Sequence, residues 1–231
     1  MSVMLAMAVA SLLAAAGESG WQDESPATAR TVLRDFAYCS VRNEPEAARR
    51  FVMLNDGERL ADADFSRLFD GRCLGFRGGR LSMRSWRSRS ALAEAFIRRQ
   101  SKSRRPLAFA DVAPLEWPVA SVRQLDRKAG AADDIAREEA LREAERLVSA
   151  LGECVVRADP SGVLSVLDSN IDSSKEAARF GALTPHIAGC VKKGQTLAFN
   201  RTNLRSGLAL SYFRLAAKRT ATVQATAGGT R

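Results

Sequence analysis

The amino-acid sequence predicts an all-α fold made of two tandem, pseudo-symmetric units, each with about four short helices and each closed by one disulfide. Three observations predict this fold. The composition is rich in Ala, Leu and Arg and poor in Tyr, which favours helix over strand. A pattern that contains two cysteines occurs twice along the chain. Apolar residues recur at helical spacing after residues that commonly begin helices, such as proline and capping Ser or Asp.

The repeated pattern consists of Cys-x-Val-Arg-x-x-Pro, then a second cysteine, then Arg-Ser-x-Leu-Ala. The first copy extends over 39–93 and the second over 154–209. The offset between the copies is 115 at the first cysteine, 117 at the second cysteine and 116 in the Arg-Ser segment. Because the shifts fall in predicted loops and the order of the elements is kept, we infer an internal duplication.

All four cysteines, Cys39, Cys73, Cys154 and Cys190, belong to this pattern. An even number of well-spaced cysteines in an exported chain predicts disulfides. A structural zinc site normally places two ligands about two to four residues apart, whereas the gaps here are 33 residues or more. No metal and no cofactor is therefore expected. Three pairings are compatible with four cysteines, and duplication of a self-sufficient unit favours Cys39–Cys73 with Cys154–Cys190.

Residues 1–16 are predicted to be a signal peptide. An apolar run extends from Val3 to Ala16 and is interrupted only by Ser11. This run is too short to span a bilayer, but it fits the hydrophobic region of a secretory signal, and its last residues suit cleavage after Ala16. We therefore expect a periplasmic or extracellular protein with no transmembrane helix in its mature chain. The alternative is a buried amino-terminal helix.

Residues 25–100 are predicted to form the first unit. Ser25 before Pro26 is typical of a helix start, as is a proline after an acidic residue further along. The elements expected, in chain order, are a helix from Pro26, a helix from Pro45, a helix that contains Phe65 and Leu68, a glycine-rich loop over 75–79, an extended stretch over 81–83, and a helix over 88–99.

Residues 101–131 are predicted to be a linker, because prolines there interrupt any helix. The second unit is expected over 132–217, followed by a flexible tail over 218–231. Its expected elements are a helix over 133–153 with an apolar stripe of Leu141, Ala144, Val148, Leu151 and Val155, a helix from Pro160, a helix capped by Ser173 and Glu176, a new turn from Pro185, and a final helix over 202–217.

No known catalytic pattern is present in the sequence. His186 is the only histidine, so a histidine-based metal cluster is excluded, and its place after Pro185 at a predicted helix start is typical of a solvated side chain. The sequence contains no phosphate-binding glycine loop and no nucleophile motif of the hydrolase type. We therefore predict no catalytic residues, although the sequence does not decide whether the protein is an enzyme.

Positive charge is concentrated in corresponding parts of the two copies. The formal net charge is +9; residues 72–105 contain eleven Lys or Arg and one acid, and residues 177–231 contain nine Lys or Arg and no acid. Such clusters predict an anionic partner, either an envelope surface or an acidic protein. Nucleic acid does not suit an exported protein. The alternative is a solvated arginine-rich face that binds nothing.

Six arginines are candidate anion-binding residues. Four occupy repeated positions and two lie in the first basic cluster: Arg42 with Arg157, Arg89 with Arg205, and then Arg84 and Arg87. Two roles are open for the repeated pairs. They line an anion pocket across the pseudo-twofold axis, or they bind loop carbonyls at helix ends through their several donors.

The cysteine pattern and its Leu-Arg-Ser-x-Leu-Ala ending from Leu204 resemble a group of uncharacterised exported proteins of alphaproteobacteria. The resemblance implies an exported helical protein and brings no activity with it. Our first functional hypothesis is a non-enzymatic exported protein that presents a basic face to an anionic partner or envelope surface. The alternative is a small-ligand carrier or an enzyme with a pocket between the two units. The oligomeric state is not predicted.

Overall fold

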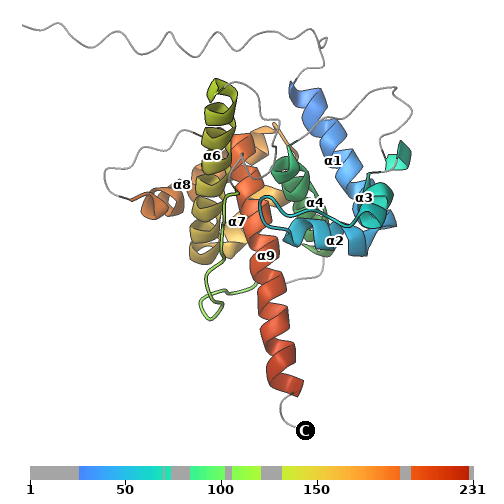
Figure 1. Ribbon diagram of the computed structural model, residues 1–231. Coiled ribbons are helices and arrows are strands. Elements are labelled where there is room, and N and C mark those ends of the chain that lie inside the picture. The colour runs from blue at the N-terminus through green and yellow to red at the C-terminus, as the bar shows by residue number, and fades with distance from the viewer. Residues whose placement is uncertain are drawn as a thin grey trace, which may run out of the picture.

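The protein is all-helical throughout the part of the chain that the structure describes. The structure, a computed structural model, describes residues 26–69, 71–73, 84–101, 106–120, 132–192 and 199–228 (Figure 1). The predicted signal peptide, the glycine-rich loop, the extended stretch after it, and parts of the linker lie outside these residues. None of the helices in the described ranges combines the length and the apolar character needed to cross a bilayer.

The helices follow the order that the sequence predicts. The first half contains α1 (Pro26–Asn43), α2 (Pro45–Met53), α3 (Asp62–Leu68), the 3₁₀ turn η1 (Gly71–Cys73) and α4 (Ser85–Ser101). The second half contains α6 (Ala132–Ala158), α7 (Pro160–Asp168), α8 (Ser174–Cys190) and α9 (Arg201–Gly228).

Proline and capping side chains begin several helices, as predicted. Pro45 opens α2 and Pro160 opens α7, where a residue without an N–H loses no hydrogen bond. The Asp159 side chain accepts a hydrogen bond from the Gly162 amide at the start of α7. Ser173 likewise accepts from the Glu176 amide at the start of α8. These contacts satisfy N–H groups that a helix leaves unpaired in its first turn.

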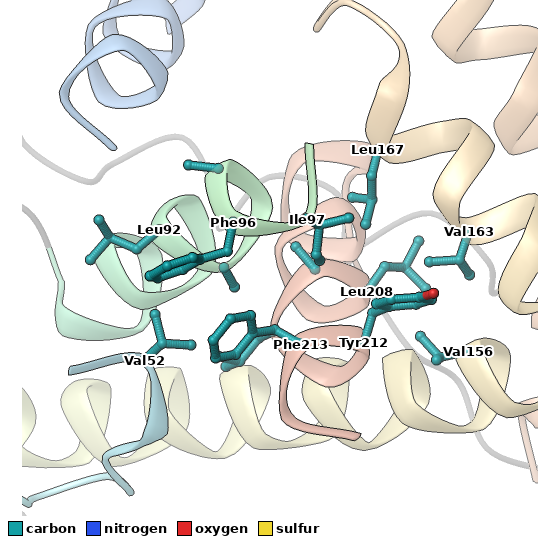
Figure 2. Packing of buried hydrophobic residues seen from close by; sticks show 14 of the residues in the cluster. Val52, Leu92, Phe96, Ile97, Val156, Val163, Leu167, Leu208, Tyr212 and Phe213 are labelled. Carbon is teal, nitrogen blue, oxygen red and sulfur yellow. The ribbon is translucent and has the colours of Figure 1, made fainter. Parts of the chain in front are cut away.

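Helices α4 and α9 lie side by side at the centre of the molecule, and the others pack around this pair (Figures 1 and 2). Helices α1 and α2 pack on α4, while α6 and α7 pack on α9. In addition, α4 contacts α7 and α9 contacts α2. The contacts therefore occur in matching pairs across the two halves. The pseudo-twofold relation itself stays a prediction; below, a residue's counterpart is the residue aligned with it in the sequence repeat.

The core consists mainly of aliphatic residues and a few aromatic rings. Between α4 and α9 the rings of Phe96 and Phe213 lie 5.1 Å apart, and Leu92 and Leu208 are fully buried (Figure 2). Burial of such side chains is the main favourable contribution to folding. The core thus extends across both halves of the chain, and the hydrophobic cluster continues into α7 and α6.

Two disulfides confirm the favoured pairing. Cys39 bonds to Cys73, and Cys154 bonds to Cys190. Each bridge links the end of a long helix, α1 or α6, to the end of the third helical segment of its half. On the loop-entropy model, closing loops of 34 and 36 residues contributes about 4 kcal/mol each to stability.

Several predicted boundaries and surfaces differ from the structure. Helix α8 continues through Pro185 to Cys190, so no new turn starts there. Helix α9 extends to Gly228, beyond the predicted end at residue 217, and α4 begins at Ser85 instead of residue 88. In the predicted stripe of α6, Leu141 is 44% exposed, because the neighbouring helices cover α6 only from Val148 onward.

Candidate functional site

The carboxyl ends of α2 and α7 each bind two arginines. Both helices end at a C-cap residue in extended conformation, Leu54 for α2 and Ser169 for α7. The last carbonyl groups of a helix lack partners within it and carry a partial negative charge, so arginine donors are favourable there. Leu54 and Ser169 are counterparts, which makes the two ends directly comparable.

The α7-end cluster consists of Arg98, Arg205, Glu94 and Glu176 around the carbonyl groups at the end of α7. Arg205, on α9, donates to the carbonyl oxygens of Val166 (3.0 Å), Leu167 (2.8 Å) and Ser169 (3.1 Å). Arg98, on α4, donates to the carbonyl oxygen of Ser169 at 3.3 Å. One arginine therefore comes from the same half of the chain as α7 and the other from the opposite half.

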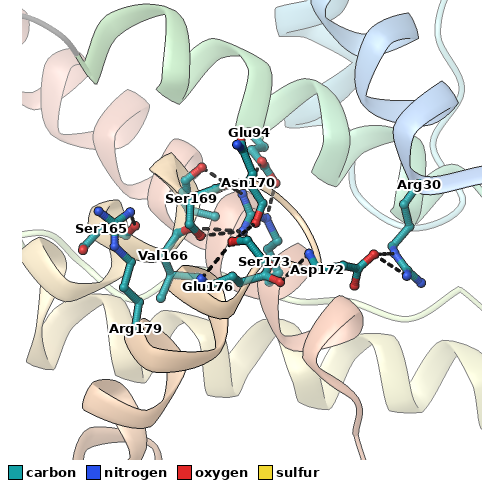
Figure 3. A network of polar contacts seen from close by, with 12 residues as sticks. Arg30, Glu94, Ser165, Val166, Ser169, Asn170, Asp172, Ser173, Glu176 and Arg179 are labelled. Carbon is teal, nitrogen blue, oxygen red and sulfur yellow. Dashed lines mark hydrogen bonds and ion pairs between the residues drawn. The ribbon is translucent and has the colours of Figure 1, made fainter. Parts of the chain in front are cut away.

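Two carboxylates complete the α7-end cluster (Figure 3). Glu94 accepts from Nε and Nη2 of Arg205 at 2.9 and 2.6 Å, and Glu176 accepts from Nη1 at 2.6 Å. Burial alone would lower the pKa of Arg205, but the hydrogen bonds and charges of Glu94 and Glu176 raise it. Arg205 is 4% exposed, and its charge is balanced by buried acids.

The α2-end cluster consists of Arg89 and Arg214 around the carbonyl groups of Val52 and Leu54. Arg89, on α4, donates through Nη1 to the Leu54 carbonyl. Arg214, on α9, donates to the same carbonyl and to that of Val52 at 3.2 Å. This arrangement corresponds to the α7 end, because Arg89 is the counterpart of Arg205 and Arg98 is the counterpart of Arg214.

The two clusters differ in their acids. The counterpart of Glu94 is Leu210 and the counterpart of Glu176 is Ala61, so neither carboxylate is present at the α2 end. Arg89 is 5% exposed, and its buried Nε has no hydrogen-bond partner among the described residues. Leaving a buried donor unsatisfied costs about 1–3 kcal/mol, and more when the group is charged.

The electrostatics of the α2-end cluster reflect this missing charge. Burial lowers the pKa of Arg89, and the charges of Asp56, Glu145 and Glu58 offset this only in part. Burial, together with repulsion from the Arg89 guanidinium, lowers the pKa of Arg214 to about 10. Both arginines remain cationic at neutral pH, so two like charges lie together in a largely buried site without an acid bound to either.

A recess with a free volume of about 30 Å³ adjoins the α2-end cluster. Its walls come from α4, α6, α9 and the strap, which we define as residues 106–120. The Trp117 ring of the strap lies 5.0 Å from the Arg214 guanidinium carbon, a favourable cation–π distance. The Trp86 indole N–H, on α4, donates to the Ser149 hydroxyl at 2.9 Å. Both tryptophans line the recess together with Arg89 and Arg214.

The other predicted arginines contact different parts of the protein. Arg157 donates to strap carbonyls, including that of Phe109 at 2.7 Å, and to Glu153, whereas its counterpart Arg42 is exposed at the end of α1. The structure shows no contact that brings Arg42 and Arg157 together. Arg84 pairs with Glu138 (2.7 Å) and Glu145 (2.5 Å), and the exposed Arg87 donates to Asn203 at 3.3 Å.

Sequence reasoning singled out Arg89 and Arg205 but did not consider Arg98, Arg214 or Trp117 as site residues. The alignment of the copies already paired Arg98 with Arg214, and that pairing was the available signal. His186 is largely solvated, with its Nε2 3.8 Å from an Asp159 oxygen. Among the described residues no group of His, Cys, Asp and Glu is arranged to hold a metal ion.

Comparisons of this chain with protein families, with curated proteins and with solved structures found no match. The functional interpretation therefore depends on the geometry of the two clusters and on the sequence repeat.

Proposed function

We propose that the protein is an exported, disulfide-stabilised, non-enzymatic binding protein that recognises an anionic group in the recess of the α2-end cluster. The observation that carries the proposal is the buried Nε of Arg89, which has no partner among the described residues. An anion in the recess supplies the missing acceptor and also the negative charge that Arg89 and Arg214 lack. A bound anion therefore relieves both an unmet hydrogen bond and a like-charge repulsion.

A recess is better supported than a broad basic face. In the described part of the first basic cluster, Arg84 is bound by acids, while Arg89 and Arg98 donate to helix-end carbonyls. These cations are oriented inward and are not free to meet a flat anionic surface. The recess also combines elements of both halves, as the alternative hypothesis of a pocket between two units requires.

Tryptophan fluorescence provides a direct test, because two of the three tryptophans in the chain line the recess. The disulfide-intact protein is titrated with acetate, sulfate and inorganic phosphate at constant ionic strength. We expect saturable quenching by at least one anion. Arg89→Gln keeps a donor for the Leu54 carbonyl but loses the charge, so affinity falls about 10- to 100-fold, as expected for a hydrogen bond to a charged group.

Arg42→Gln is the matched control, because it removes one positive charge from an exposed position away from the recess. This variant should bind like the wild type. Circular dichroism checks that both variants are folded. The proposal is contradicted if no anion binds the wild type, or if Arg89→Gln and Arg42→Gln bind with the same affinity.

A further inference from the structure

We infer that the anionic group bound by the α2-end cluster is a carboxylate, held in the position where the α7-end cluster holds the carboxylate of Glu94. This inference rests on the proposed function, since it names the chemistry of the ligand at the same site. It is drawn from the repeat inside the molecule, in which one copy of the site already contains its acid.

The α7-end cluster shows how this arginine position binds an acid. Both oxygens of Glu94 accept from the Nε–Nη2 edge of Arg205, at 2.9 and 2.6 Å (Figure 3). A planar guanidinium and a planar carboxylate match in this two-bond arrangement, which gives directional specificity as well as strength. The remaining donors of Arg205 contact carbonyls at the end of α7 and Glu176.

At the α2 end the same edge is the one without a partner. Arg89 uses Nη1 for the Leu54 carbonyl, while its Nε is buried and unpaired among the described residues. The counterpart of Glu94 is Leu210, which lines the recess and has no acceptor. The unpaired atom at the α2 end is thus the counterpart of the atom that binds Glu94 at the α7 end.

The acids nearest to Arg89 are engaged by other donors. Asp56 accepts from Arg142 at 2.8 Å and from the Ala120 amide at 3.1 Å. Glu145 accepts from Arg84 at 2.5 Å, and Glu58 accepts from the Asn55 amide at 2.6 Å. None of these carboxylates contacts Arg89 in the described part of the chain. The acceptor for its Nε must therefore come from a molecule that enters the recess.

The size and walls of the recess favour a carboxylate over a larger anion. Its free volume of about 30 Å³ is room for about two water molecules, and a carboxylate has two oxygens whereas phosphate and sulfate have four. The strap residues Trp117, Pro118 and Val119 form an apolar wall, and Val119 is 38% exposed. A carboxylate on an apolar body therefore fits better than a bare anion.

The probes that test the inference are acetate, benzoate and inorganic phosphate, titrated at constant ionic strength and followed by tryptophan fluorescence. We expect benzoate to bind more tightly than acetate, and phosphate to bind at least 10-fold more weakly than acetate. Phosphate binding equal to or tighter than acetate binding overturns the carboxylate inference and leaves the anion-binding proposal intact. Absence of binding by all three overturns both.

Internal carboxylates provide a second test. Leu210→Glu and Ala61→Glu restore, one at a time, the two acids of the α7 end, and Ala61 is exposed, so its substitution does not disturb the core. Each variant is compared with its neutral control, Leu210→Gln or Ala61→Gln. We expect acetate affinity at least 10-fold lower in the acidic variants than in the controls. If Ala61→Glu, shown to be folded, binds acetate as tightly as Ala61→Gln, the inference is wrong.

Discussion

The carboxyl ends of α2 and α7 have the same architecture and opposite electrostatics. At each end one arginine comes from α4 and one from α9, and both donate to the final carbonyls of a short helix. At the α7 end two buried glutamates balance Arg205, whereas Leu210 and Ala61 take their places at the α2 end. Two substitutions between repeats thus separate a fully satisfied structural cluster from one with a buried, unpaired donor.

The difference indicates a division of roles between the two ends. A buried polar network contributes to a unique structure when every member is satisfied, and departures from this rule concentrate at functional sites. The α7-end cluster meets the rule and joins α4, α7, α8 and α9. The α2-end cluster departs from it at one atom, the Nε of Arg89. We therefore assign stability to the first cluster and binding to the second.

The largest predicted effect concerns the removal of each arginine. Arg205→Met leaves the buried Glu94 and Glu176 without their cation, so we expect a loss of about 3–5 kcal/mol in the free energy of unfolding. Arg89→Met removes one hydrogen bond, to the Leu54 carbonyl, and also removes the repulsion with Arg214, so we expect a loss below about 1.5 kcal/mol.

Urea unfolding of the two methionine variants measures these values from the shift of the midpoint, provided that the slope is unchanged. Arg205→Lys serves as a control that keeps the charge but not the fork of donors. Equal losses for Arg89→Met and Arg205→Met would show that the two ends contribute alike to stability, against the division of roles.

The next effect concerns the helix pairs that support the two ends. Helices α6 and α9 approach each other at Gly152 and Gly207, where a Cβ on Gly152 would lie 2.6 Å from the Gly207 carbonyl group. The counterparts in α1 and α4 are Ala37 and Ala91, so the α1–α4 pair accommodates the extra methyl groups. Gly152→Ala is therefore predicted to destabilise the protein by about 1–3 kcal/mol through a backbone clash, despite the better helix propensity of alanine.

Ala37→Gly, at the counterpart position, is the control and is expected to cost about 1 kcal/mol, mainly through helix propensity. Differential scanning calorimetry of both variants compares the two helix pairs directly. A Gly152→Ala variant that is as stable as the wild type would mean that α6 and α9 can separate without loss, and that their close approach is not required.

The fold class and the disulfides were predictable from the sequence because they depend on local patterns. Helix starts follow from Pro45, Pro160 and Ser173, and the pairing of cysteines follows from the duplication. Burial was less predictable. The apolar stripe of α6 includes Leu141, which is exposed, because a helical stripe indicates a buried face only where another element covers it.

The candidate site was predictable only in part, for a similar reason. Arg89 was identified from its repeated position, and the exchange of Glu94 for Leu210 can be seen in the aligned copies. Its meaning requires the knowledge that the Glu94 carboxylate contacts Arg205, which is distant in sequence. The exchange of arginines between halves, with Arg214 at the end of α2, likewise depends on how α4 and α9 pack.

The smallest effect is a difference in acid sensitivity between the α2–α3 and α7–α8 contacts. Arg50 on α2 and Arg67 bind Asp64 on α3, and these hydrogen bonds lower the pKa of Asp64 from 3.8 to about 2. At the counterpart positions Arg179 on α8 donates to the carbonyl of Ser165 on α7, which does not titrate near neutral or acidic pH. Only the first contact therefore depends on a carboxylate.

The sign of the pH dependence follows from the lowered pKa of Asp64. Its carboxylate stabilises the folded state above the unfolded pKa of 3.8, and this contribution is lost as the pH falls toward about 2. Amide hydrogen exchange should therefore show lower protection of α3 in Asp64→Asn than in the wild type at pH 6, and nearly equal protection near pH 2. The reduced protection of α8 in Arg179→Gln should persist across the same range. If the Asp64→Asn difference also persists near pH 2, the Asp64 side chain acts through packing instead of charge, and the two contacts are equivalent after all.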